Sequence, residues 1–336
     1  MTLRLRVDAE RWRAHLRSVA AATHGLVPVA KGNGYGFGIP LLAGETAALG
    51  LDTLAIGTYA ELDDVSDVDL SIVVLSPWRP FVTARLQDRR VIHTVSRVED
   101  LAALASTPHR PRVLVEVLTS MHRHGIPAQR LRAVTGLLSG VDMVGWSVHL
   151  PLVGDTTGQA RELADAARAV VDAPVWVSHV PAERLGEVAP QVRSRVGTGL
   201  WLGDRGALRV ESTVLDVHPL PGGAPFGYRQ RTVRRSGATL LVVSGGTAHG
   251  IALSAPSPAT TARQRGVAVA DGGLQALGRA RSPFIVAGHH AWFAEPPHMH
   301  CSMLWLPRGA PVPAIGTTLP VQVRHTTTLV DEVVLR

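Results

Sequence analysis

Short apolar runs alternate with helical patterns over residues 9–205 of this 336-residue chain. Amphipathic or alanine-rich stretches separate the runs, as in residues 9–22 and 158–171. Because strands buried on both faces read as continuous apolar runs, eight such strand–helix steps predict a (β/α)8 barrel. The eight expected strands are Leu26–Ala30, Thr53–Ile56, Ile72–Leu75, Val91–Thr94, Val113–Val117, Met143–Val148, Val175–Val177 and Gly199–Leu202.

The pattern changes at about residue 206. Strand-like segments then alternate with turn signals such as Pro221-Gly222-Gly223 and Asp271-Gly272-Gly273, and helical periodicity is nearly absent. We therefore predict a barrel domain over residues 8–206 and a mostly-β domain over residues 207–336. The segment Thr2–Val7 alternates apolar and basic residues, so we expect it to pair with the second domain.

Composition narrows the classes of function. A net charge of +7 and a pI of about 10.7 raise the question of nucleic acid, but the arginines are scattered and aromatic residues make up only 4%, too few for base-stacking platforms. One cysteine excludes an intrachain disulfide framework. The first residues lack an apolar signal core, and no stretch approaches ~18 uninterrupted apolar residues. We expect a cytoplasmic protein that binds neither nucleic acid nor membrane.

Lys31 is the only lysine, and the other 33 of the 34 Lys and Arg residues are arginine. Either cation serves solvation and ion pairing, so a generic position gives no reason to keep one lysine. A lysine amine can lose its proton and attack a carbonyl once desolvation lowers its pKa, which arginine cannot do. Lys31 ends an apolar run and opens a glycine-rich turn. We predict a Schiff-base lysine; a chance survivor in a loop is the alternative.

These residues and the two-domain pattern resemble the alanine racemase family, fold-type III pyridoxal-phosphate (PLP) enzymes with a barrel and a C-terminal β domain. The family's lysine motif reads roughly V-x-K-A-N-A-Y-G-H-G, and residues 29–38 here read V-A-K-G-N-G-Y-G-F-G. The resemblance implies that Lys31 carries pyridoxal 5'-phosphate and that Tyr35 contacts its phosphate. Two extra glycines and Phe37 depart from the motif, and we expect them to loosen the loop.

The segment 119–125, T-S-M-H-R-H-G, is similar to the family's D-T-G-M-x-R-x-G. The resemblance implies that Arg123 hydrogen-bonds the phenolic oxygen of the cofactor and contacts the substrate. Seven residues earlier many members carry a carbamylated lysine, whereas this chain has Glu116. A carboxylate gives the guanidinium a fixed anionic partner, so we predict that Glu116 pairs with Arg123 and holds it in position without contacting the cofactor itself. An unrelated strand end and loop is the alternative.

Further cofactor-binding residues are expected after the later strands. His149 matches a family histidine, although a lone histidine at a strand end can also be an ordinary hydrogen-bonded polar residue. Barrels commonly hold phosphate near strands seven and eight through backbone N–H groups and a hydroxyl, and Ser178, Gly197 and Thr198 suit that task.

Arg195 is the most informative of the expected cofactor contacts. Residues 195–198, R-V-G-T, are similar to the family's R-P-G-I, whose arginine faces the pyridine nitrogen of PLP. A guanidinium cannot accept a proton, so the ring nitrogen stays unprotonated and the cofactor is a weaker electron sink. This arrangement favours racemisation over transamination.

Tyr228 is one of three tyrosines and opens the expected β domain in F-G-Y-R-Q-R. The segment resembles the family's G-Y-G or S-Y-G, whose tyrosine is the second catalytic base and reaches the active site of the other subunit. We therefore predict a homodimer that interconverts L- and D-amino acids, with Lys31 and Tyr228 moving the Cα proton on opposite faces.

The C-terminal third fits the family least. Met299 matches the substrate-contacting methionine of C-M-D-Q, but His300 stands where an aspartate is usual. His298, His300 and Cys301 are potential ligands of a soft metal ion, as in PLP- and metal-dependent D-amino acid dehydratases and aldolases. We expect no metal and a pocket-shaping role. That lyase, and a non-catalytic PLP-binding homologue, remain the alternatives.

Overall fold

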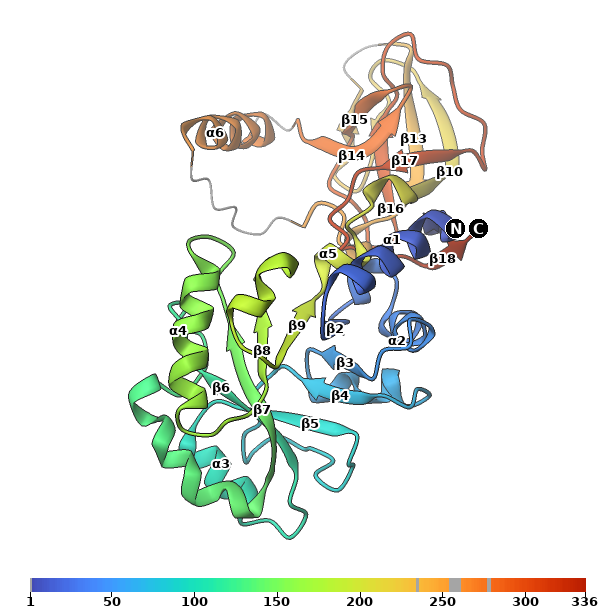
Figure 1. The fold of residues 1–336 in the computed structure, drawn as a ribbon. Helices are drawn as coiled ribbons and strands as arrows, with labels where there is room; N and C mark the ends of the chain where they lie inside the picture. The colour runs from blue at the N-terminus through green and yellow to red at the C-terminus, as the bar shows by residue number, and fades with distance from the viewer. Residues whose placement is uncertain (1, 234–235, 254–260, 277–278) are drawn as a thin grey trace. The chain divides into compact units, whose positions relative to one another are not determined.

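The computed structural model describes residues 2–336 except 234–235, 254–260 and 277–278, and divides the chain into two compact units. One unit is Arg11–Asp204. The other joins Met1–Glu10 to Arg205–Arg336, so that the two ends of the chain belong to one unit. Figure 1 traces the elements of each along the sequence. No helix among the described residues is long and apolar enough to cross a membrane.

The first unit is built on an eight-stranded parallel sheet in the order β2-β9-β8-β7-β6-β5-β4-β3 (Figure 1). Val29 bridges Ala55, and the Ala30 N–H donates to Ala55 O at 2.8 Å, so the two edges of the sheet meet and the barrel is nearly closed. The predicted TIM-like barrel is confirmed. Its strands are β2 (Leu26–Pro28), β3 (Thr53–Ile56), β4 (Ser71–Val74), β5 (Val91–Val95), β6 (Arg112–Val117), β7 (Asp142–His149), β8 (Val175–Ser178) and β9 (Val192–Val196).

Helices connect most of these strands. Residues 75–90, between β4 and β5, contain no helix, and several connections are 3₁₀ rather than α-helical. The α-helices are α1 (Ala9–Ala22), α2 (Ile39–Ala48), α3 (Val98–Ala105), α4 (Thr156–Arg168) and α5 (Thr198–Trp201), and the 3₁₀ helices are η1 (Gly34–Gly36), η2 (Tyr59–Val65), η3 (Ala128–Gly140) and η4 (Ala182–Glu187).

The last barrel strand is β9, and the expected strand Gly199–Leu202 is wrong. Those residues fall largely in helix α5, whereas β9 reads V-R-S-R-V and was hidden by its two arginines. Arg193 extends over the ring of Trp176, with its guanidinium carbon 4.7 Å from the ring centroid. Arg195 is buried among strand ends. A strand with paired or covered arginines does not show the continuous apolar run expected of a buried parallel strand.

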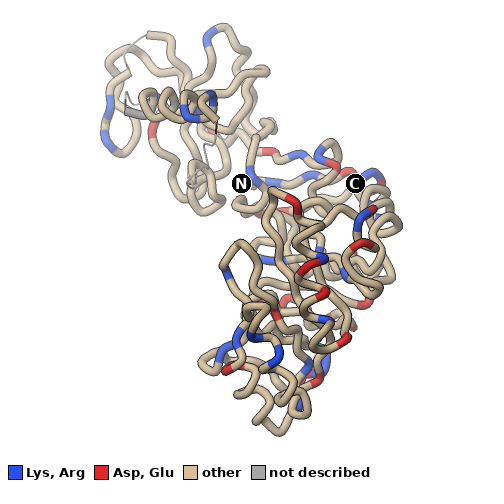
Figure 2. Tube along the Cα trace, turned by 60° about the vertical axis from the view of Figure 1, so that its left-hand side comes forward, with Lys and Arg blue, Asp and Glu red and all other residues tan. Residues whose placement is uncertain are grey.

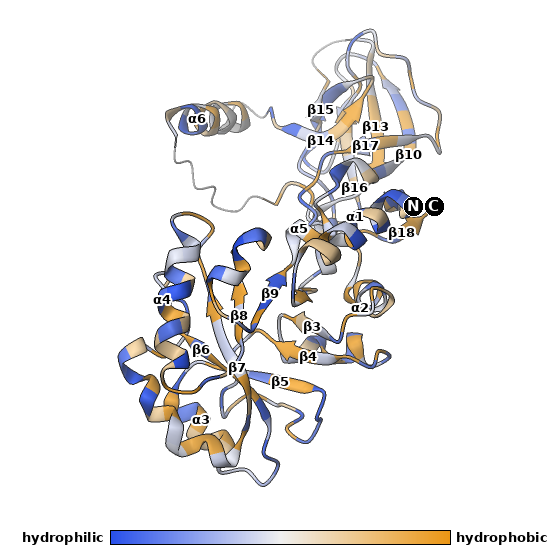
Figure 3. Cartoon of the chain, viewed as in Figure 1, coloured by the Kyte–Doolittle hydropathy of each residue, from blue (hydrophilic) through white to orange (hydrophobic). Residues whose placement is uncertain are grey.

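Two apolar clusters stabilise the barrel. An inner cluster draws one or two residues from most strands, including Val73, Ile92 and Trp176. An outer cluster joins alternate strand residues to helix residues such as Leu101 and Ala164. Figure 3 shows the corresponding pattern, with β4 and β8 hydrophobic along their length and α4 carrying both apolar and polar residues. Because both faces of these strands are buried, the strands can be recognised in the sequence as runs of consecutive apolar residues.

The second unit is an antiparallel β domain, as predicted. Strand β10 pairs with β1, β17 and β13, and the order β10-β13-β16-β15-β14-β17 closes into a ring to which β1 and β18 are added. The elements are β1 (Leu3–Val7), η5 (Arg205–Ala207), β10 (Leu208–Leu220), β11 (Pro225–Phe226), β12 (Arg231–Thr232), β13 (Ala238–Ser244), η6 (Thr247–His249), α6 (Ala262–Ala276), β14 (Arg281–Val286), β15 (His289–Phe293), β16 (Cys301–Trp305), β17 (Thr318–Val321) and β18 (Glu332–Leu335).

Helix α6 contradicts the expectation that helices are absent from this region. It includes Asp271-Gly272-Gly273, which we expected to form a turn. No described residue of α6 is buried, so the helix has no apolar face against the β domain. Without such a face there is no 3.6-residue hydrophobic period to find in the sequence.

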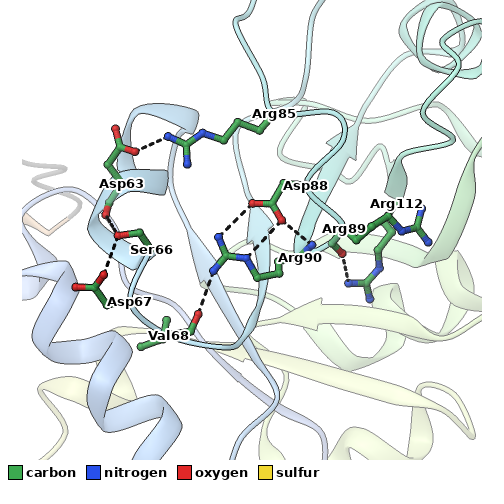
Figure 4. Close-up of polar contacts among 9 residues, drawn as sticks. All are labelled: Asp63, Ser66, Asp67, Val68, Arg85, Asp88, Arg89, Arg90 and Arg112. Atoms are coloured by element: carbon green, nitrogen blue, oxygen red, sulfur yellow. Dashed lines mark hydrogen bonds and ion pairs between the residues drawn. The ribbon is translucent and has the colours of Figure 1, made fainter.

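Arginine makes the surface ion pairs and hydrogen bonds that arginine and lysine share in most proteins. In the close-up of Figure 4, Arg90 pairs with Asp88 at 3.2 Å and also donates to Val68 O at 3.1 Å, while Arg112 donates to Arg89 O at 3.1 Å. A planar guanidinium can serve a carboxylate and a carbonyl at once, which a single ammonium does less well. Figure 2 shows basic and acidic residues interspersed along the barrel unit.

Three aromatic residues fasten the loop after β2 to the barrel. Trp12 of α1 is fully buried and stacks on Phe37 at 4.7 Å between ring centroids. Its indole N–H donates to Trp201 O at 3.0 Å, and the indole of Trp201 donates to Val29 O at 2.9 Å. The departure at Phe37 from the family motif therefore completes an aromatic contact beneath the loop that carries Lys31.

We expect Trp12→Ala to lower the free energy of unfolding by ~3–5 kcal/mol, because it removes a buried aromatic side chain and leaves a cavity. Trp12→Phe keeps most of the packing and loses one hydrogen bond, so its cost should be ~1 kcal/mol. Urea unfolding followed by circular dichroism measures both. Equal stability of Trp12→Ala and the wild type would show that this contact does not hold the loop.

Candidate functional site

The carboxyl ends of neighbouring barrel strands bring several predicted site residues together. His149 ends β7, Ser178 ends β8 and Arg195 lies near the end of β9, and the three are consecutive partners across the sheet register. Lys31 follows β2, which pairs with β9. In barrels of this class the carboxyl ends carry the chemistry, so this is the expected place for a reactive lysine.

The electrostatic surroundings of Lys31 favour its neutral amine. The residue is exposed, but its pKa is lowered, chiefly by desolvation of the amine and then by the positive charges of Arg123 and Arg195. Glu61 acts in the opposite direction. A lysine with a lowered pKa has more free amine at neutral pH, which nucleophilic attack requires.

One glycine of the Lys31 loop, Gly34, is required by the shape of the turn. Gly34 has φ +58°, and a Cβ added there would lie 2.7 Å from the backbone nitrogen of Ile39. Tyr35 itself has φ 56°, a left-handed conformation that is uncommon for a residue with a side chain. The turn therefore requires glycine at position 34, and the expectation that the glycines loosen the loop stays a prediction.

Glu61 holds this loop, and the sequence analysis did not find it. Its carboxylate accepts the N–H groups of Gly32 at 2.9 Å, Gly57 at 2.6 Å and Thr58 at 3.2 Å. It therefore ties the residue after Lys31 to the end of β3 and the start of η2. The signal in the sequence was the T-x-x-E spacing from Thr58 to Glu61, a capping box at a helix start.

Tyr35 lies against the turn that follows β9. It is buried, and its hydroxyl hydrogen-bonds the side chain of Thr198. A Cβ added to Gly197 would lie 2.1 Å from the Tyr35 hydroxyl oxygen, so only glycine fits at that position. Burial raises the pKa of Tyr35, which keeps the hydroxyl protonated and able to donate a hydrogen bond.

Arg195 is a buried cation at the end of β9. It donates to Ser147 Oγ at 3.0 Å, to Val148 O at 3.1 Å and to Trp176 O at 3.4 Å. Burial lowers the pKa of Arg195 to about 10, so it remains charged at neutral pH. Its Nε is buried without a hydrogen-bond partner among the described residues.

Glu116 is buried on β6 and interacts electrostatically with three arginines, Arg195, Arg123 and Arg79. Burial raises the pKa of Glu116, and Arg195 opposes the rise more than Arg123 does. Glu116 is buried, whereas Arg123 stands in an exposed bend. Glu116 Oε2 has no hydrogen-bond partner in the described chain. The expected support of Arg123 by Glu116 thus stays a prediction, and the arginine with the larger electrostatic effect on Glu116 is Arg195.

His149 and Ser178 are hydrogen-bonded to each other at 2.7 Å, between Nδ1 and the hydroxyl oxygen. Burial, followed by the charges of Arg195 and Arg123, lowers the pKa of His149 to about 3. The imidazole is therefore neutral at physiological pH. The Ser178 oxygen also accepts the Leu150 N–H at 3.3 Å, so this hydroxyl already has two partners within the barrel.

Tyr228 and Met299 lie in the β unit and line one cleft of about 660 Å³. Tyr228 is 82% exposed and Met299 is 67% exposed. Arg229 and Arg231 also line the cleft. Tyr228 and Met299 are the two active-site residues that we predict from this unit, and both line the same cleft.

The residues considered as metal ligands make other contacts. His298 Nε2 lies 2.6 Å from Glu295 Oε1, and the His300 ring lies 6.0 Å from that of His249. His298 and His300 belong to the turn before β16. No three His, Cys, Asp or Glu side chains of the described chain converge as ligands of a metal ion would.

Glu61→Gln should destabilise the fold by ~1–3 kcal/mol, because the charged carboxylate accepts three backbone N–H groups and the amide replaces one acceptor oxygen with a donor. Hydrogen exchange at Gly32 and Gly57 should become faster, and urea unfolding gives the free energy. The matched control is Glu99→Gln, an exposed acid that pairs with arginine and should change little. Unchanged exchange at Gly32 would contradict the role of Glu61.

The titration of Lys31 can be measured directly, since reductive methylation with ¹³C yields one lysine signal. We expect its pKa below the ordinary lysine value, and Arg123→Gln should raise it, whereas Arg17→Gln should not. The unfolded chain binds more protons than the folded one in this range, so the contribution of Lys31 to stability rises with pH. A Lys31 pKa at or above the ordinary value would refute the desolvated site.

Comparison with known proteins places the chain among its relatives. The sequence model described as alanine racemase, N-terminal domain, matches residues 7–181. An alanine racemase of Methylobacterium sp. (strain 4-46) is 26% identical over 273 residues, 74% of each protein. One from Corynebacterium glutamicum is 26% identical over 156 residues, which are 45% of this chain and only 43% of that relative.

Solved structures share the fold across nearly the whole chain. The alanine racemase of Clostridium difficile 630 has a TM-score of 0.71 at 16% identity, covering 95% of this chain and 86% of that one. An alanine racemase from Bartonella henselae with covalently bound pyridoxal phosphate has a TM-score of 0.67 at 17% identity, covering 97% and 91%. Because the family's sequence model also covers more than half of the chain, this protein belongs to the alanine racemase family.

Proposed function

We propose that this protein is a PLP-dependent amino-acid racemase and acts as a homodimer. The observation that carries the proposal is Lys31, the only lysine, which stands at the carboxyl end of the barrel with a lowered pKa and two arginines acting on it. Membership of the family and the cofactor bound by the Bartonella relative support PLP as the group involved.

The barrel residues fit this cofactor. Gly197 leaves a bare backbone beneath the Tyr35 hydroxyl, and backbone N–H groups with a hydroxyl such as Thr198 suit a phosphate. The unpartnered Nε of Arg195 is a buried donor that the described chain leaves unsatisfied. We assign Lys31 to the covalent link, Tyr35, Ser178, Gly197 and Thr198 to the phosphate, and Arg195, His149 and Arg123 to the ring.

When bound, PLP withdraws electrons from the substrate Cα and so makes its proton removable. Arg195 keeps its own proton, since its pKa of about 10 lies well above neutrality, and it therefore offers a donor without acting as an acid. The Lys31 amine takes or returns a proton at Cα on one face. A general base in position contributes ~10²–10⁴-fold to rate.

Tyr228 is assigned to the opposite face. Different groups must handle the two proton transfers for the configuration at Cα to invert. Because the family's tyrosine comes from the second subunit, we assign Tyr228 to the active site of the partner, and Met299 to contact with the substrate. The cleft that these two residues line is the part of the β unit that we expect to face it.

Replacement of Lys31 tests the proposal. The purified wild type should be yellow, absorbing at about 420 nm as a PLP–lysine conjugate does, and borohydride should label a single peptide. Lys31→Arg should be colourless and should not racemise any member of a panel of L- and D-amino acids analysed by chiral chromatography. The control Arg17→Lys adds an exposed second lysine and should still be labelled only at Lys31. A coloured, active Lys31→Arg protein would refute the assignment.

A further inference from the structure

Tyr228 stands on a hairpin that has little stability of its own. Strands β11 and β12 have two residues each, and the loop between them spans Gly227–Gln230. Isolated two-stranded hairpins are at best marginally stable in water. The Tyr228 side chain is also 82% exposed. Contacts from outside the hairpin must therefore fix the position of this residue.

Glu295 supplies the first contact, from a position 67 residues further along the chain. Its side chain is 5% exposed, and its Oε2 accepts the Tyr228 N–H at 3.0 Å. A Cβ added to Gly227, which has φ +70°, would lie 2.1 Å from that same oxygen. The hairpin tip thus folds around a buried carboxylate, and a glycine is required to let it approach.

His298 supplies the second contact. Its ring centroid lies 4.5 Å from that of Tyr228, with 40° between the planes. The Glu295 Oε1 lies 2.6 Å from His298 Nε2, so the carboxylate that holds the tyrosine backbone also orients the imidazole against the tyrosine ring. On its other side, His298 Nδ1 lies 3.8 Å from Cys301 Sγ. One hydrogen-bonded pair, Glu295 and His298, therefore fixes both the main chain and the ring of Tyr228.

We propose that Glu295 and His298 are positioning residues that hold Tyr228 as the second base. The inference rests on the proposed racemase function. Neither residue needs to touch the substrate, because the tyrosine hydroxyl is the group directed to the reacting carbon. We call the Glu295–His298 pair the clamp. A reacting group misplaced by about 1 Å can cost ~10²-fold in rate, so loss of the clamp should lower the rate of catalysis measurably.

The clamp can be tested without turnover. The chain has three tyrosines, of which Tyr35 and Tyr59 belong to the barrel unit, so ¹³C-tyrosine labelling gives a spectrum in which Tyr228→Phe identifies the Tyr228 ring signals. In the apoprotein, Glu295→Gln and His298→Gln should move these signals toward those of a free tyrosine, while His300→Gln, in the same turn, should not. Signals of Tyr228 that stay in place in both variants would overturn the clamp.

Catalysis provides the second readout, in deuterated water. Tyr228→Phe defines the enantiomer whose α-hydrogen exchange depends on the tyrosine. Glu295→Gln and His298→Gln should slow exchange of that enantiomer by ~10–10²-fold and leave the other nearly unchanged. An equal fall in the exchange rate of both enantiomers would indicate a general structural role and overturn the proposal. His298→Asn replaces His298→Gln if that variant folds poorly.

If the wild type exchanges the α-hydrogen of neither enantiomer, the racemase assignment fails. The apoprotein spectra then still show whether Glu295 and His298 position Tyr228.

Discussion

A buried arginine at the end of the last barrel strand organises the chemistry of this protein. Arg195 donates to a hydroxyl and to carbonyls at the ends of neighbouring strands and interacts electrostatically with Glu116, so the carboxyl edge of the barrel must remain in register to solvate its charge. Desolvation is the main reason that the pKa values of Lys31 and His149 are lowered, and the positive charges of Arg195 and Arg123 lower them further. The buried cation thus adds to what burial already does to the protonation of its neighbours.

The barrel could be predicted from sequence wherever burial is uniform. Strands such as β4 and β8 read as apolar runs because both of their faces are covered, whereas β9 was missed because its arginines are neutralised or stacked by residues far away in the chain. Helix α6 was missed for the opposite reason, since it buries none of its described residues. Hydrophobic patterns in a sequence indicate which segments are buried. They do not reveal a strand whose buried residues are charged, or a helix that is exposed on all sides.

The site shows the same division. Lys31 and Tyr35 could be found because a local motif places them, but the partners that define their surroundings come from distant segments. Glu61 joins the loop from 29 residues beyond Gly32, and Glu295 reaches Tyr228 across 67 residues. Contacts of this kind depend on the tertiary fold, and a single sequence carries no direct signal of them.

The buried carboxylate beneath the hairpin tip has a consequence for assembly. Because Glu295 and Tyr228 belong to one chain, the contact that holds the hairpin tip needs no second subunit. An interface that immobilises a flexible side chain loses ~0.5–1.5 kcal/mol for each one, and a side chain ordered beforehand avoids that loss. In the homodimer that we propose, a tyrosine held in this way would lower the conformational-entropy cost of association.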